Sequence, residues 1–237
     1  CQTCTTRCPQ GLDITAIMAF LTREAVRLGL QPQVPEVDIL NQAFRREVRL
    51  WGRSYELGLM AEMKLRTGRL TEDLDLGVKI IRKNKLPFLP KLARPPKRPK
   101  PVPATADTVA YYPGCSLHST AAEYNASAKA VCEALGLKLH EPPGWVCCGS
   151  TPIHRAYPET ALRLPLENLR LVEQMGLDEV VMPCAACFNH TRMALHEVRH
   201  DPQRKAEVEG AMNYAYQDSV RVSALCEALF RRVGAQK

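Results

Sequence analysis

The sequence predicts a multidomain protein with a mainly α-helical N-terminal part and an α/β C-terminal part. Apolar residues recur at helical spacing through the first third of the chain. A proline-rich run then excludes regular helix and sheet. Beyond it, short apolar runs of strand length alternate with longer amphipathic stretches, the pattern of a parallel sheet flanked by helices. We expect a helical domain at 1–86, a linker at 87–106 and an α/β domain at 107–237.

Three helices are predicted in the first part. Asp13 is a suitable N-cap for a helix that continues to Gly29. A second apolar stripe ends at Gly52, and a third begins at Tyr55 and ends near Gly68. Apolar stripes of this kind form helix packing faces. We therefore expect the three helices to support the N-terminal cysteine loop described below.

The stretch that follows is basic and rich in proline. A weaker fourth helix is predicted from Thr71 to about Lys85, and residues 87–103 hold seven prolines, which favours a semi-rigid extended linker. Residues 79–103 contain nine Lys or Arg and no acid, so the net charge of +7 becomes −2 elsewhere. The basicity is local, which argues against a nucleic-acid surface. A solvated linker and a contact with an acidic partner subunit both remain as interpretations.

The α/β part is predicted to place its loops at one edge of a sheet. Strands are expected at 108–112, 137–139 and 179–182, and each leads into a loop that contains cysteine. Because the carboxyl ends of parallel strands meet at one edge, these loops should gather there. A further strand at 220–222 and a helix through Phe230 complete the part.

Two helices of the α/β part have readable boundaries. Thr120 and Glu123 have the spacing of a capping box, and the stripe from Tyr124 to Leu135 is expected to face the core. Pro165 lies inside a later helical stretch. Proline is favoured in the first turn of a helix, so we expect the helix to restart there.

The chain has ten cysteines and no apparent secretory signal, which favours ligands or redox groups over structural disulfides. Two of them, Cys132 and Cys226, lie in helical patterns and are interpreted as small core residues. The other eight lie in short islands beside proline or glycine. These islands carry the chemistry.

The first island has the spacing C-x2-C-x3-C-P, formed by Cys1, Cys4 and Cys8. Short cysteine spacing in a tight loop is typical of a cubane [4Fe–4S] cluster, and the run matches the later part of a bacterial ferredoxin motif. That motif requires a further cysteine three residues before Cys1. Zinc is the alternative, but three thiols leave it one ligand short.

Five more thiols are expected to meet at the sheet edge: Cys115, Cys147, Cys148, Cys184 and Cys187. They exceed the four ligands of a tetrahedral zinc. The adjacent pair can reach different metals of one polynuclear cluster more easily than a single ion. A zinc site with a spare cysteine and a vicinal disulfide switch are the alternatives.

Two histidines, His118 and His154, lie near these cysteines in the sequence. Either could supply protons to chemistry at the thiols. The alternative is that each is an ordinary loop or capping histidine.

The C-terminal cysteine islands belong to longer motifs. Residues 107–198 resemble the CCG cysteine-rich domain of the heterodisulfide reductase B subunit, through Tyr112-Pro-Gly-Cys-Ser-Leu, Trp145-Val-Cys-Cys-Gly, Glu167-Asn-Leu and Pro183-Cys-Ala-Ala-Cys-Phe-Asn. The resemblance implies a noncubane [4Fe–4S] cluster on all five cysteines. It also implies that the cluster splits a disulfide in one-electron steps.

The N-terminal part resembles the second half of the heterodisulfide reductase C subunit, through Cys-x-Thr-Cys-x-x-Arg-Cys-Pro, Leu12-Asp-Ile and Tyr55-Glu-Leu-Gly-Leu-Met. This implies an α-helical ferredoxin-like fold whose cubane clusters relay electrons. The whole chain therefore resembles a C–B fusion that holds one of two CCG motifs and the later part of one ferredoxin motif. We expect the missing pieces in flanking sequence or in a partner chain.

These observations give three functional hypotheses. The leading one is a heterodisulfide-reductase-like redox subunit, inactive alone, with a flavin-containing A-like or other dehydrogenase subunit as partner. The second is the electron-transfer subunit of a flavin dehydrogenase, of glycolate, lactate, glycerol-3-phosphate or succinate/fumarate type, linked to quinone. The third is a zinc-stabilised docking scaffold.

Membrane segments are not predicted in the given sequence, because its apolar runs fall short of the roughly 18 residues that span a bilayer. We expect a cytoplasmic protein, peripheral at the membrane through its partners.

Overall fold

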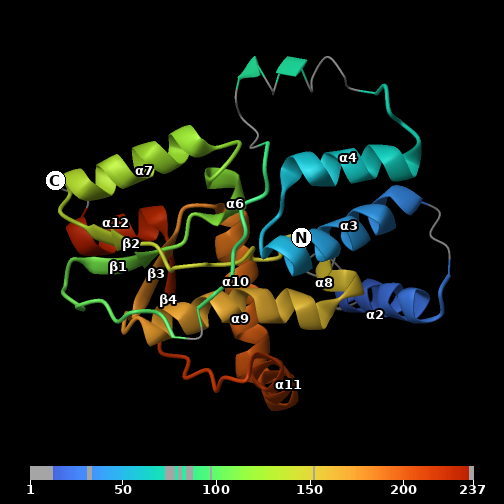
Figure 1. The fold of residues 1–237 in the computed structure, drawn as a ribbon. Coiled ribbons are helices and arrows are strands. Elements are labelled where there is room, and N and C mark those ends of the chain that lie inside the picture. The colour runs from blue at the N-terminus through green and yellow to red at the C-terminus, as the bar shows by residue number, and fades with distance from the viewer. Residues whose placement is uncertain are drawn as a thin grey trace.

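A computed structural model describes residues 13–30, 34–72, 78–79, 82–83, 88–96, 98–151 and 153–234. Figure 1 shows helices of the N-terminal part packed beside a small sheet with its own helices. The predicted cubane ligands Cys1, Cys4 and Cys8 lie outside the described residues. Most of the predicted fourth helix does so too.

The N-terminal part contains helices α2 (Ile14–Arg27), α3 (Pro35–Trp51) and α4 (Glu56–Thr67), close to the predicted bounds. The Asp13 side chain accepts a hydrogen bond from the N–H of Ala16 and caps α2. Gly52 ends α3 at φ 76°, a conformation that favours glycine. Helices α3 and α4 pack against each other, and α2 packs against the short helix α8 (Ile153–Ala156).

The C-terminal part is built on a parallel sheet of β1 (Thr108–Tyr111), β2 (Lys138–His140), β3 (Glu179–Met182) and β4 (Arg221–Ala224). The strand order is β2-β1-β3-β4, and every pairing is parallel. The predicted strands are confirmed, with β2 shifted by one residue and β4 extended. The other helices of this part are α6 (Gly114–Leu117), α7 (Ala122–Ala134), α9 (Pro158–Gln174), α10 (Ala185–His200), α11 (Pro202–Met212) and α12 (Leu225–Val233).

The two faces of the sheet are covered by different helices. Ala110 and Val180 belong to a large core cluster that includes α9 and α10 residues. Their neighbours Val109 and Val181 pack on the other face with Ala228 of α12. This alternation is the period of two that a strand imposes, and it gives the predicted α/β architecture.

The predicted start of α7 is wrong, and of its predicted inward stripe only Ala128 is buried. Ala121, not Thr120, is the N-cap, and no side chain completes a capping box there. Tyr124 is 46% exposed and Val131 is 44% exposed. The helix turns its smaller residues inward, because it lies at the edge of the sheet beside the short strand β2.

The prediction that a helix restarts at Pro165 is also wrong, because α9 continues through it. A proline lacks the N–H that would bind the carbonyl four residues earlier. Here that carbonyl belongs to Ala161, and His190 Nε2 lies 3.1 Å from it. A histidine of α10 therefore supplies the donor that Pro165 lacks.

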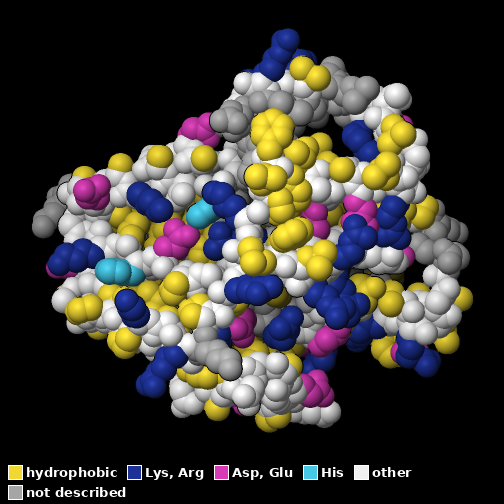
Figure 2. All heavy atoms as spheres, viewed as in Figure 1, with side chains coloured by type: hydrophobic (Ala, Val, Ile, Leu, Met, Phe, Trp, Pro, Cys, Tyr) yellow, Lys and Arg dark blue, Asp and Glu magenta, His cyan; other side chains and the backbone are white. Residues whose placement is uncertain are grey.

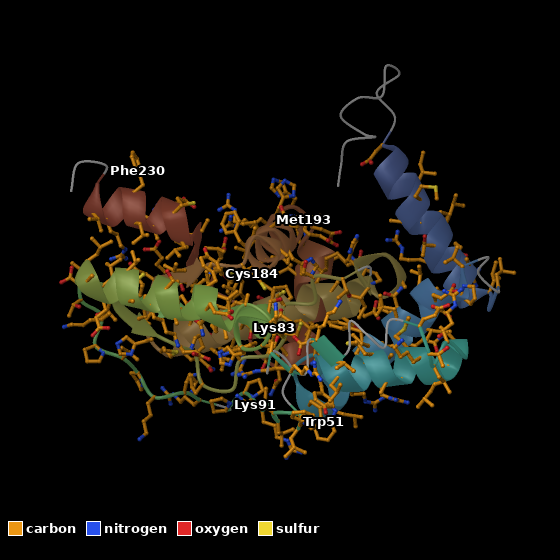
Figure 3. All side chains as sticks on the ribbon, turned by 90° about the horizontal axis from the view of Figure 1, so that it is seen from above. Trp51, Lys83, Lys91, Cys184, Met193 and Phe230 are labelled. Atoms are coloured by element: carbon orange, nitrogen blue, oxygen red, sulfur yellow. The ribbon has the colours of Figure 1, made fainter. Side chains whose placement is uncertain are left out.

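The proline-rich segment packs between the two parts. The N–H of Ala93 donates to the carbonyl of Trp51, and the N–H of Val102 donates to the carbonyl of Met175. The described Lys and Arg side chains of the basic stretch 79–103 are exposed, including Lys83 and Lys91, which Figure 3 labels. Figure 2 shows further Lys and Arg side chains over α3.

The two cysteines that were predicted to lie in the core have different surroundings. Cys132 is buried as predicted, but Cys226 is exposed, so its assignment to the core is wrong.

Within the part of the chain that the structure describes, no helix is both long enough and apolar enough to cross a membrane.

Candidate metal centre

The five C-terminal thiols lie at the carboxyl edge of the sheet, as predicted. Cys115 is in α6, directly after β1, and the adjacent pair Cys147 and Cys148 follows β2. Cys184 is the N-cap of α10, after β3, and Cys187 lies in the first turn of that helix. Figure 3 shows Cys184 at the start of α10, between the helices that cover the sheet.

The sulfurs form one contiguous group. Cys148 Sγ lies 3.2 Å from Cys187 Sγ. Hydrogen-bonding contacts extend from this pair to Cys147 and then Cys115 on one side, and to Cys184 on the other. The central three thiols are buried, whereas Cys115 and Cys184 are partly exposed. The group therefore has a buried middle and two ends near the surface.

Gly114 permits this gathering. Its φ is 77°, a conformation that L side chains rarely adopt. A Cβ at this position would lie 2.8 Å from Cys187 Sγ. The glycine thus brings the Cys115 helix against the Cys184–Cys187 turn.

Burial and mutual contact control the charge of the thiols. Hydrogen bonding to Cys147 and burial raise the pKa of Cys115 well above its usual value. For Cys147, Cys148 and Cys187, a hydrogen bond with one neighbouring thiol lowers the pKa, but a bond with the other neighbour and burial outweigh it and raise the pKa. Without a bound cation, these four are protonated thiols at neutral pH.

Cys184 is the exception. The Cys187 thiol and the backbone N–H groups of Ala186 and Cys187 donate to its sulfur, and they lower the pKa of Cys184 to about 6 despite burial. These N–H groups are the unpaired donors of the α10 N-terminus, which favour negative charge. A thiolate is therefore available at neutral pH on one end of the group.

The loop that carries Cys147 and Cys148 is fixed by Asn168 of α9. Asn168 accepts a hydrogen bond from the N–H of Val146 at 2.8 Å and donates to the carbonyl of the same residue at 2.9 Å. Tyr112 Oη also donates to that carbonyl, at 2.7 Å. These contacts give a physical role to the Tyr112 and Glu167-Asn-Leu motifs.

A turn of the N-terminal part completes the site, which the cysteine pattern did not predict. The N–H of Cys147 donates to the carbonyl of Gly52 at 2.8 Å. The N–H of Ser54 donates to the Cys115 sulfur. Arg53 Nε donates to the carbonyl of Trp145 at 2.9 Å, and its guanidinium lies 3.4 Å from the Trp145 ring centroid. In the sequence, only the Tyr55-Glu-Leu-Gly-Leu-Met motif marks this neighbourhood.

The Trp145 indole links this turn to an acidic group. Its Nε1 donates to Glu141 at 2.6 Å, and His118 Nε2 lies 3.1 Å from the same carboxylate oxygen. Burial opposes ionisation of Glu141, but the contacts with His118 and Trp145 and the charge of Lys129 outweigh it and lower the pKa of Glu141 to about 2. The carboxylate is therefore ionised under all ordinary conditions.

The two predicted histidines have different surroundings. His118 and Cys115 line one small pocket together with Arg53 and Glu56. His154 lines a separate cavity of about 400 Å³ with His190, and its Nδ1 lies 2.9 Å from the carbonyl of Thr151. The structure thus brings His118 to the edge of the thiol group and sets His154 beside another cavity.

The donor set can be compared with the needs of a metal. Thiolates favour zinc, copper(I) and iron–sulfur clusters. Among the described residues, no three His, Cys, Asp or Glu side chains are arranged around a single metal ion. Five contiguous sulfurs form a ligand set larger than one ion requires. Backbone N–H groups donate to Cys115, Cys147, Cys148 and Cys184.

Comparison with known proteins identifies the cysteine-bearing part. Residues 109–192 match the family described as the cysteine-rich domain, CCG. The 8-methylmenaquinol:fumarate reductase membrane anchor subunit of Wolinella succinogenes is 33% identical over 127 residues, covering 52% of this chain and 44% of that protein. An uncharacterized iron–sulfur protein of Methanococcus maripaludis is 33% identical over 79 residues, covering 33% and 16% respectively.

A fold likeness extends further along the chain. The crystal structure of a hypothetical protein from Helicobacter pylori matches 92% of this chain and 43% of that one, with a TM-score of 0.50 and 14% identity. The chain thus spans less than half the length of each of these three proteins. The C-terminal half of the chain contains a CCG cysteine-rich domain, and its named relatives are an iron–sulfur protein and a reductase subunit.

Proposed function

We propose that the chain is an iron–sulfur electron-transfer subunit of a quinone-linked oxidoreductase of the succinate/fumarate type. The observation that carries this proposal is the gathering of five cysteine sulfurs within a CCG domain. The more specific choice of complex rests on the relative from Wolinella succinogenes, which is named as a subunit of a menaquinol:fumarate reductase. That similarity covers half of this chain, so the partners belong to the proposal.

The sulfur group suits a polynuclear cluster for two reasons. Adjacent cysteines such as Cys147 and Cys148 can bind different metals of one cluster. Backbone N–H groups donate to Cys115 and Cys184, and hydrogen bonds to the sulfurs are one of the features that set the potential of an iron–sulfur cluster. When bound, such a cluster supplies one-electron transfer; the chain's own residues hold it and exclude water from its centre.

Because most of the thiols are protonated, binding of the cluster depends on the release of their protons. Four of the five thiols have raised pKa values, so metal binding must displace their protons. Cys184, whose pKa is lowered to about 6, is then the first ligand available at neutral pH. We expect assembly to begin at the N-terminus of α10.

Cys1, Cys4 and Cys8 complete the proposed electron path. We propose that they bind a cubane [4Fe–4S] cluster together with a cysteine from outside this sequence. A flavin-containing dehydrogenase or reductase subunit is the proposed electron partner. Contact with the membrane would then be made within that complex.

The test is anaerobic purification of the complex with and without Cys147→Ser. The account predicts iron and sulfide at the CCG site in the parent protein and the loss of its electron paramagnetic resonance signal in the variant. Cys132→Ser is the matched control, since Cys132 is buried in α7 away from the sulfur group. Zinc without sulfide would favour a docking scaffold and overturn the proposal.

Disulfide reduction is a second candidate, favoured by the partial exposure of Cys115 and Cys184 at the two ends of the group. In this reaction two electrons and two protons convert one disulfide into two thiols. Turnover of a small disulfide by the complex, lost in Cys147→Ser, would support it. Oxidation of a quinol analogue without any disulfide turnover would exclude it and leave the first proposal standing.

A further inference from the structure

Arg53 lies at the thiol group with a chemistry that the five-cysteine motif does not explain. It is a partly buried residue in the turn between α3 and α4. Its guanidinium stacks on Trp145, a fully buried ring, and its Nε binds the Trp145 carbonyl. Cys147 is two residues further along the same loop. The cation is therefore held against the loop that carries two of the thiols.

The contacts of Arg53 leave its positive charge uncompensated by an ion pair. Within the described ranges, no carboxylate lies within ion-pairing distance of it. The nearest acids are engaged elsewhere, because Glu141 contacts Trp145, His118 and Lys129, and Glu56 accepts a hydrogen bond from Ser119. Holding an unpaired cation partly out of water is costly unless negative charge lies nearby.

Glu141 contributes negative charge near Arg53, but that charge is shared with His118 and Lys129, so the thiols are the groups that can supply the rest. Cys115 and Cys147 are among the electrostatic neighbours of Arg53, and Cys115 lines the same small pocket. As protonated thiols they are neutral and do not compensate the positive charge of Arg53. As thiolates on a metal cluster they would carry the charge that complements it.

We propose that Arg53 is a positioning residue that compensates the negative charge of the thiolate-bound cofactor in the CCG domain and raises its reduction potential. This inference rests on the proposed iron–sulfur function. Reduction adds one electron to an already anionic site, and a nearby cation stabilises the reduced form more than the oxidised form. Net charge and hydrogen bonds to sulfur are two of the features that set cluster potentials.

The position of Arg53 has a consequence for the whole chain. Arg53 and the Ser54 N–H that donates to Cys115 come from the same turn of the helical part. The cofactor of the CCG domain thus takes two stabilising groups from outside that domain. Docking of the helical part then sets the potential of the site to which it delivers electrons.

The experiment is a redox titration of the assembled complex, followed by electron paramagnetic resonance, with Arg53→Gln and Arg53→Lys. Arg45→Gln is the matched control, because Arg45 is an exposed arginine of α3 that also stacks on an aromatic ring, that of Tyr157. At a fixed potential, Arg53→Gln should lower the ratio of reduced to oxidised cluster about tenfold, which is about 59 mV for a one-electron couple. Arg53→Lys should retain most of the parent ratio, and Arg45→Gln all of it.

The other possible results distinguish charge compensation by Arg53 from a structural role and from failure of the proposed function. An unchanged potential in Arg53→Gln, at full cluster content, would overturn the inference. If Arg53→Gln cannot hold the cofactor, Arg53→Lys decides: retention supports charge compensation, whereas equal loss assigns Arg53 a purely structural role. A parent protein without any iron–sulfur signal would refute the proposed function itself, which is a distinct result.

Discussion

At the scale of single residues, the site depends on close approach. Gly114 brings Cys115 against the α10 turn because it has no side chain to strike Cys187 Sγ. His190 binds the Ala161 carbonyl that Pro165 leaves free. The sequence shows glycine beside the cysteine islands and a proline inside a helical stretch. It could not predict which distant residues would contact them, because these contacts depend on helix packing.

Gly114→Ala should therefore impair the site directly. The added methyl would meet the Cys187 sulfur at 2.8 Å in a backbone conformation that alanine disfavours. We expect a loss of about 2–4 kcal/mol in the free energy of unfolding and a marked fall in bound iron. Gly136→Ala is the matched control, since it has a similar φ of 78° but no neighbour within 4 Å. Equal losses in the two variants would contradict a steric role for Gly114.

At the scale of elements, hydrophobic periodicity and capping residues predicted most helices and strands well. The errors lie where tertiary contacts replace local signals. The α7 capping box does not form, and α9 passes through Pro165 because α10 supplies a donor. The convergence of the cysteine islands could be predicted, since strand ends of a parallel sheet share an edge. The Gly52–Glu56 turn could not, because no cysteine or metal-ligand spacing marks it.

A buried carboxyl group of α3, next to the start of α4, should make the stability of the protein depend on pH. Glu47 of α3 accepts a hydrogen bond from the N–H of Tyr55, and burial outweighs this bond and raises the pKa of Glu47 to about 7. The carboxyl is therefore more easily charged in the unfolded chain, whose pKa is near 4.5. Its contribution to stability is full below about pH 4.5 and is lost as the pH rises through about 7.

Glu47→Gln should remove this loss. The parent loses about 3 kcal/mol of this stabilisation between pH 4.5 and pH 8, because each unit of the Glu47 pKa shift corresponds to roughly 1.4 kcal/mol. The free energy of unfolding of the variant, relative to that of the parent, should therefore be higher at pH 8 than at pH 4.5 by about this amount. Urea denaturation at both pH values measures the difference. Glu133→Gln, on the exposed side of α7, serves as the control and should show little change. A pH-independent effect of Glu47→Gln would refute the assignment.

At the scale of the whole molecule, the helical part and the CCG domain share a small core. Phe44 and Val48 of α3 pack with Val146, Cys147 and Ile153 of the cysteine-bearing part. The backbone bond from Cys147 to Gly52 lies beside this cluster. The two parts are thus coupled through the loop that carries the adjacent thiols, a contact that the predicted arrangement of two domains and a linker did not include.

Phe44→Ala should test this coupling. Phe44 is 2% exposed, and removing its ring should cost about 3–4 kcal/mol in the free energy of unfolding. Because the cavity would lie against Cys147, the iron content should also fall. Phe230→Ala on α12, where the ring is 68% exposed, should change neither quantity appreciably. Unchanged iron content in Phe44→Ala would show that docking of α3 is not needed to hold the cofactor.

The five C-terminal thiols are proposed to hold one polynuclear iron–sulfur cluster. The most direct measurement is iron, zinc and sulfide analysis of the anaerobically purified protein in which Cys4 and Cys8 are changed to serine, which removes the N-terminal site. The account predicts about four iron and four sulfide per chain, both lost on the further change Cys147→Ser. One zinc per chain without sulfide would contradict it.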